Sequence, residues 1–222
     1  YFYGVELLEN QNLNSNNLIL SVIIFLGFLV FLIKKIDPNQ FDFLKNPFKI
    51  KLYYQRYLID RNFKIFDKFY LLIYSYILIS ISLFLSFFGK YFLDIPITIF
   101  NFLKISILLA IFMLLRSLNY IIILRIIKNW IILQQYWFHS LIFNFQSIFF
   151  LIVITTTLEL NGFLTLKSFK YILVTFISLS IYFNLNALVK ILKDSTKNFI
   201  YLFYYICASK ILPWVLLANY YL

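Results

Sequence analysis

Cysteine and histidine are almost missing from this chain, and their scarcity excludes several kinds of site. The 222 residues contain one cysteine, Cys207, and one histidine, His139. A single cysteine excludes an internal disulfide, a cysteine-ligated iron–sulfur cluster and a structural zinc site. A single histidine excludes a bis-histidine haem held by this chain alone, as in a cytochrome b or an oxidase core subunit. We therefore expect no metal ion and no cofactor.

Small residues and acidic residues are also few. The chain has 4 glycines, 4 alanines and 9 acidic residues, against 28 phenylalanines and 18 tyrosines. Membrane bundles normally use small residues to bring helices close together, so aromatic side chains must fill that space here. No glycine-rich phosphate loop, paired catalytic carboxylates or Ser–His–Asp set can be assembled from these residues. We expect no catalytic residue and no enzymatic activity from this chain alone.

Apolar residues, in contrast, are abundant and grouped in long runs. The chain is 63% hydrophobic and 13% charged, which exceeds what one soluble core of this length could bury. Residues 18 to 32 do not alternate between apolar and polar, as a transmembrane strand would. The sequence predicts an all-α, polytopic single membrane domain over 1–222 with about six spans, each near the ~20 residues that a bilayer requires. The predicted spans are 17–33, 69–93, 96–115, 141–162, 168–189 and 199–220.

The basic residues gather on one side of the predicted membrane. Nine of the twenty lie in the loop 34–68, three follow the third span and three follow the fifth, whereas three fall on the other side. Basic loops remain on the side from which a chain is inserted, so both termini should face the opposite side. Anionic phospholipid, such as cardiolipin, then accounts for the net charge of +11, and nucleic acid is not needed as a partner. The aromatic residues of loop 34–68 favour a basic amphipathic surface helix that docks a neighbouring subunit.

The stretch 116–139 is the ambiguous part of this topology. It is apolar, but it contains Arg116, Arg125 and Lys128 together with several amides. We predict an interfacial helix here, and a seventh span is the alternative.

Charged residues inside predicted spans are the candidates for a mechanism, because an unpaired charge at mid-bilayer costs several kcal/mol. Lys210 lies near the middle of the last span, Lys104 lies about two turns into the third, and Glu159 lies near the far end of the fourth. Arg116 follows the third span. These four residues indicate either a proton relay or charges that reach the membrane surface or pair with neighbours.

Three resemblances bear on function. The composition of the chain is biased toward Phe, Tyr, Ile, Asn and Lys, and in this it resembles the hydrophobic proteins encoded by ciliate mitochondrial genomes. This resemblance implies an inner-membrane subunit of a respiratory-chain or ATP-synthase complex. Arg116 with Asn119, followed by Glu159, resembles the proton-path residues of ATP synthase subunit a. Arg116, Arg125 and Lys128 are weakly similar to a voltage-sensor helix, although their spacing does not repeat every third residue.

The expected function is therefore a non-catalytic structural or accessory transmembrane subunit of a mitochondrial respiratory-chain complex, with complex IV or complex I favoured. The expected location is the mitochondrial inner membrane, with basic loops in the matrix and both termini toward the intermembrane space. The alternatives are a proton-translocating subunit, such as a divergent ATP synthase subunit a or complex I subunit, and a stand-alone ion channel.

Overall fold

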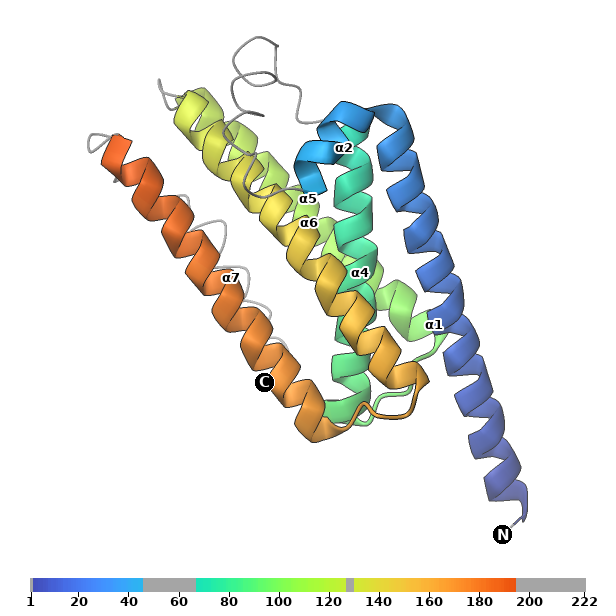
Figure 1. The fold of residues 1–222 in the computed structure, drawn as a ribbon. Coiled ribbons are helices and arrows are strands. Elements are labelled where there is room, and N and C mark those ends of the chain that lie inside the picture. Colours follow the sequence, from blue (N-terminus) through green and yellow to red (C-terminus); the bar gives the residue numbers. More distant parts are fainter. Residues whose placement is uncertain (1, 46–66, 127–129, 195–222) are drawn as a thin grey trace.

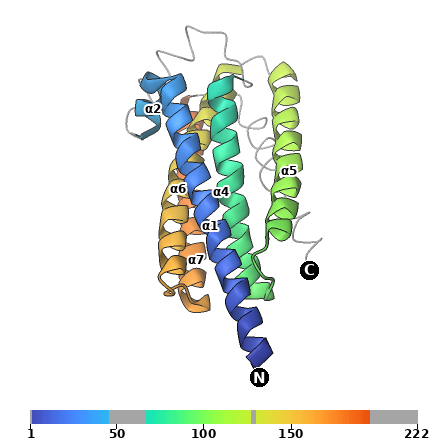
Figure 2. The same ribbon diagram turned by 90° about the vertical axis from the view of Figure 1, so that its right-hand side faces the viewer.

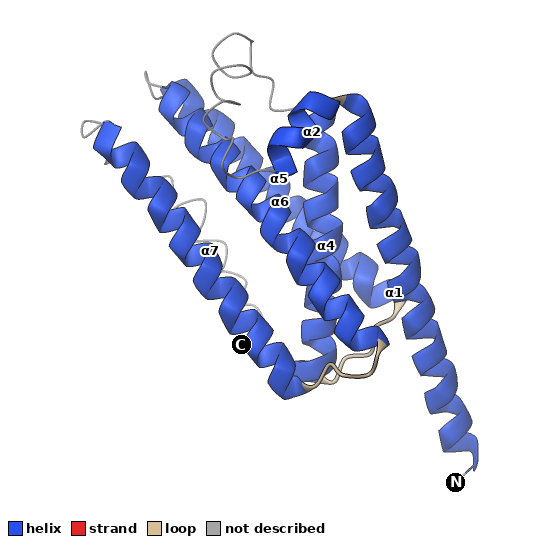
Figure 3. Cartoon of the chain, viewed as in Figure 1, coloured by secondary structure: helices blue, strands red, loops and turns tan. Residues whose placement is uncertain are grey.

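The described part of the chain is entirely helical. The computed structural model describes residues 2–45, 67–126 and 130–194, which form six helices and no strands (Figures 1 and 3). The prediction of an all-α fold is confirmed for these residues. The helices are α1 (Phe2–Ile36), α2 (Pro38–Lys45), α4 (Lys68–Leu93), α5 (Ile99–Ile126), α6 (Trp130–Leu160) and α7 (Leu166–Asp194).

Four helical segments are long and apolar enough to cross a membrane. They coincide within a few residues with the first four predicted spans, and the chain is therefore a membrane-embedded helical protein. The fifth predicted span, 168–189, falls inside α7, which is not among the four, and the sixth, 199–220, lies outside the described residues. Both stay predictions. The four segments are Ser15–Ile36, Lys68–Leu93, Ile99–Leu118 and Ser140–Leu160.

The helix boundaries follow from capping residues. Asp37 accepts a hydrogen bond from the Gln40 backbone N–H at 2.9 Å, and Pro38 fills the first helical position of α2. Thr98 accepts from the Asn101 N–H at 3.3 Å where α5 begins. Each cap satisfies a backbone N–H that the first helical turn leaves without a partner. These helices therefore start directly after their capping residues.

The long helices run alternately up and down and form two hairpins. Residues 94–98 join α4 to α5, and residues 161–165 join α6 to α7, at the same end of the bundle (Figure 1). We call this end the turn end. The opposite end, where α1 ends and α4 begins, we call the basic end, because Lys34, Lys35 and Lys68 lie there. The C-terminal end of α7 also lies at the basic end (Figure 1).

Helix α4 is the centre of the bundle. It contacts α1, α5, α6 and α7, while α5 stands apart from α1 and α7 on the other side of α4 (Figure 2). The short helix α2 packs on α1 and α6 at the basic end, where Gln146 of α6 donates a hydrogen bond to the carbonyl oxygen of Leu44. That bond satisfies a carbonyl at the C-terminal end of α2.

Aromatic rings fill the contacts of α4 with α6 and α7. The ring centroids of Tyr76 and Phe145 are 4.9 Å apart, and the ring of Phe169 stacks on Phe84 at 5.1 Å. Such pairs contribute about 0.5–1.5 kcal/mol beyond their buried area. Some of the many phenylalanine and tyrosine side chains therefore pack between helices. From the sequence alone, their abundance was only a bias in composition.

The stretch 116–139 differs from the predicted interfacial helix. Residues 116–126 continue α5 and residues 130–139 begin α6, so no separate helix lies between them in the described chain. The physical reason is that no proline or glycine occurs between Ile99 and Gly162 to end a helix earlier. At 28 residues, α5 is about 42 Å long and extends past a hydrocarbon core of about 30 Å.

The predicted basic loop 34–68 is described only at its two ends. Helix α2 occupies its first part, with Phe41 and Leu44 buried against the bundle. The amphipathic docking segment stays a prediction, because residues 46–66 lie outside the described residues.

Candidate functional site

A polar cluster ties the helices together at the turn end. The Lys90 Nζ of α4 forms an ion pair with Glu159 Oε1 of α6 at 2.5 Å. The neighbouring Tyr91 hydroxyl lies 2.6 Å from Glu159 Oε2 and 2.8 Å from the carbonyl oxygen of Leu164. Three elements therefore meet through one carboxylate and one phenol.

The ends of α4 and α6 place these side chains. Helix α4 stops where Asp94 adopts a left-handed conformation (φ 52°), and the Ile95 N–H donates to the Gly89 carbonyl oxygen at 3.1 Å. Helix α6 stops in the same way at Gly162 (φ 71°). Both helices run toward the turn end, so the residues of their last turns lie at one level.

The connection after α6 is held on both sides of Leu164. The Leu164 N–H donates to the Leu158 carbonyl oxygen at 3.1 Å, and its own carbonyl accepts from Tyr91. Next to it, Thr165 and Ser168 exchange hydrogen bonds in a reciprocal cap that starts α7. Glu159 thus sits beside a connection with little freedom to move.

The electrostatics of the cluster require these partners. Only 5% of the Glu159 side chain is exposed, compared with 36% for Lys90. A buried carboxylate is costly without a counter-charge and hydrogen bonds, and Lys90 and Tyr91 supply both. The tyrosine hydroxyl has one hydrogen for two acceptors, so it shares or alternates its donation between Glu159 and Leu164. The arrangement can lock helices together, and it can also hold a proton.

The predicted site residues do not come together. Lys104 is exposed on α5 and forms no ion pair with another described residue. Arg116 lies on the same helix about 26 Å from Ile99, toward the basic end. Glu159 is at the turn end, so Arg116 and Glu159 lie far apart along the bundle, and the resemblance to subunit a of ATP synthase stays a prediction. Lys210 lies outside the described residues.

Four of the buried hydroxyls in α4 and α6 bond to the backbone of their own helix. Ser82 and Ser86 of α4 donate to carbonyl oxygens of their own helix, and Thr155 and Thr156 of α6 do the same. These hydroxyls therefore do not link one helix to the next. Among the described residues, no group of three or more His, Cys, Asp or Glu side chains could hold a metal ion.

Sequence reasoning selected Glu159 but missed Lys90 and Tyr91. Lys90 is 69 residues away in the sequence and was counted only as one of three basic residues on the minor side. A usable signal existed: the second and fourth spans end on the same side, so opposite charges in their last turns lie at the same depth. Comparison of this chain with protein-family models, with curated proteins and with solved structures finds no match.

Proposed function

We propose that this chain is a non-catalytic structural or accessory transmembrane subunit of a mitochondrial respiratory-chain complex, with complex IV or complex I favoured. The observation that carries the proposal is the Lys90–Tyr91–Glu159 cluster. Its groups are bonded to one another at one end of the bundle, and this arrangement supports a joint between helices rather than a reaction centre.

The outer surface of the bundle supports membership in a larger assembly. Helix α5 presents a largely apolar face, interrupted by Lys104, on which Phe100, Ile107 and Leu114 are strongly exposed. Helix α7 adds a second such face with Tyr171, Val174 and Ile181. Lipid or the helices of other membrane subunits would cover these faces.

The charge distribution supports an orientation. The basic end would face the matrix, where Lys34, Lys35 and Lys68 would meet anionic phospholipid. The turn end would then face the intermembrane space. The composition that resembles ciliate mitochondrial gene products supports the inner mitochondrial membrane as the location.

Fractionation of the native membrane tests this proposal. Mitochondrial membranes from the source cells are solubilised in mild detergent and separated on a native gel, and the chain is located by mass spectrometry. We expect it in a band with known subunits of complex IV or complex I. Its recovery outside every respiratory-chain and ATP-synthase band would overturn the proposal.

A proton-translocating subunit is the second candidate, favoured by one observation. Glu159 is a carboxylate with a nearly buried side chain at the end of a span, in contact with the partly exposed ammonium of Lys90. Such a pair can pass a proton between the surface and the interior. Under this alternative, a Glu159→Gln variant that still assembles would abolish proton flux in membrane vesicles, with Lys167→Gln, at an exposed lysine near the start of α7, as the control. Unchanged flux would exclude this role for Glu159.

A further inference from the structure

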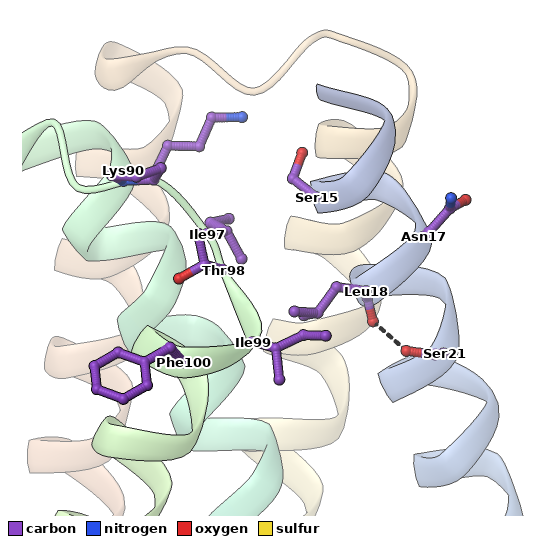
Figure 4. Close-up of a pocket in the computed structure, with 10 residues that line it drawn as sticks. Ser15, Asn17, Leu18, Ser21, Lys90, Ile97, Thr98, Ile99 and Phe100 are labelled. Atoms are coloured by element: carbon purple, nitrogen blue, oxygen red, sulfur yellow. Dashed lines mark hydrogen bonds between the residues drawn. The ribbon is translucent and has the colours of Figure 1, made fainter. Parts of the chain in front are cut away.

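A cavity opens at the turn end between α1 and α5. It has a volume of about 740 Å³ and lies between α1 and the start of α5, both of which pack on α4 (Figure 4). Its walls come from three places in the sequence: the membrane-entering part of α1, the end of α4, and the connection into α5. The lining includes Ser15, Leu18, Ser21, Lys90, Ile97 and Ile99.

Lys90 lies at one end of the cavity (Figure 4). In Figure 4, the Lys90 side chain extends toward α1, whose Ser15 hydroxyl points back toward the lysine. Leu18 and Ile99 approach each other from α1 and α5, farther from Lys90 (Figure 4). The cavity therefore has a cationic end, and apolar side chains of α1 and α5 approach each other in the remainder, which is also lined by Asn17, Ser21 and Thr98.

Lys90 can still donate hydrogen bonds to a ligand. Its ammonium carries three hydrogens, of which Glu159 Oε1 takes one, and the side chain is 36% exposed. Because Lys90 also lines the cavity, a second acceptor can reach its ammonium from there. A phosphate oxygen is the acceptor that an ammonium group binds well.

The depth of the cavity matches a lipid headgroup. Lys90 is in the last turn of a membrane-spanning helix, and Ser15 is the first residue of the span in α1. Both therefore lie at the level where the hydrocarbon core meets the headgroups. Leu18 follows Ser15 in the span of α1 and so lies deeper in the membrane. An acyl chain extends from its headgroup in the same direction.

We propose that this cavity binds one glycerophospholipid, with its phosphate on Lys90 and an acyl chain between Leu18 and Ile99. This inference goes beyond the proposed function, because it applies to any membrane in which the chain resides. It also differs from lipid contact at the basic loops, since it lies at the opposite end of the bundle. An inorganic phosphate would share the polar end but would leave the apolar walls uncovered.

Native mass spectrometry of the full chain in detergent tests the proposal. The probes are phosphatidylglycerol, diacylglycerol, which lacks the phosphate, and inorganic phosphate. We expect one phosphatidylglycerol to remain bound, and diacylglycerol to bind about tenfold more weakly, as expected when charge-assisted hydrogen bonds are lost. Equal retention of diacylglycerol would overturn the proposal, and so would inorganic phosphate binding as tightly as the lipid.

Two variants separate the site from general lipid adhesion. Ser21→Phe fills the cavity without touching the Lys90–Glu159 pair, since the Ser21 hydroxyl only donates to the Leu18 carbonyl of its own helix. Ser178→Phe is the matched control, because Ser178 is an exposed serine on α7 that bonds to its own helix in the same way. We expect Ser21→Phe to lose the bound lipid and Ser178→Phe to keep it. Equal retention by both variants would show nonspecific lipid and overturn the proposal.

Discussion

Helices α4 and α5 are alike in sequence but occupy opposite kinds of position. Both carry apolar segments long enough to span a membrane. Within the most apolar stretch of each helix, 50% of α4 is buried inside the molecule, compared with only 6% of α5. In a water-soluble protein, a peripheral helix would need a polar outer face that a central helix does not need. In a bilayer both environments are apolar, so composition does not distinguish a central helix from a peripheral one. The difference must lie in single contacts, and substitutions can expose it.

The largest effect is expected from removing a ring from α4. Phe87 is 0% exposed, and Phe87→Ala should lower the free energy of unfolding by about 3 kcal/mol. The reason is that removal of the ring leaves a void and the surrounding side chains lose their packing contacts with it. Phe100→Ala on α5, where 76% of the residue is exposed, should change stability by less than about 0.5 kcal/mol. Thermal unfolding in detergent measures both variants. Similar losses would mean that α5 is packed as tightly as α4.

A smaller effect is expected from the lysines of the two helices. Lys90→Met leaves the Glu159 carboxylate without its counter-ion and should cost about 2 kcal/mol, a value below that of a fully buried pair because Lys90 is partly exposed. Lys104→Met on α5 removes no partner within the described chain and should be neutral. The double variant Lys90→Met/Glu159→Leu should recover most of the loss. A double variant as unstable as the single one would argue against an ion pair in the native protein.

The smallest effect is expected within α4 itself, between its buried and exposed sides. Ser82→Leu should cost about 1 kcal/mol, because Ser82 is fully buried and the added atoms must displace neighbouring side chains. Ser75 is exposed on the same helix and makes the same kind of hydrogen bond to its own backbone. Ser75→Leu should therefore be tolerated, as judged by the melting temperature in the same detergent. Equal tolerance of both would mean that α4 is not the centre of the bundle.

The sequence predicted the first four spans because their signal is local. Apolar runs of sufficient length, bounded by Asp67, Asp94 and the Asn161–Gly162 turn, mark three of the helix boundaries. The extension of α5 to Ile126 was not predicted, since Arg116 and Arg125 indicated an interface although no residue there breaks a helix. A charged residue near the end of a span is compatible both with a helix that continues beyond the membrane and with a segment that lies in the interface.

The candidate site was predicted only in part, because it depends on contacts between distant segments. Glu159 was found from its position in an apolar run. Its partners Lys90 and Tyr91 could not be assigned without knowing that α4 packs against α6. Since lipid and protein interior are equally apolar, hydropathy carries no information on which helices become neighbours.

The short connections at the turn end also bear on how the chain enters a bilayer. Residues 94–98 and 161–165 are compact, and their backbone groups bond back to the helices through Gly89, Leu158 and Ser168. If insertion starts from the basic end, only these two small loops and the amino-terminal segment must be translocated among the described residues. Each helical hairpin can then cross as one unit with few unsatisfied amides, which lowers the work required of the insertion machinery.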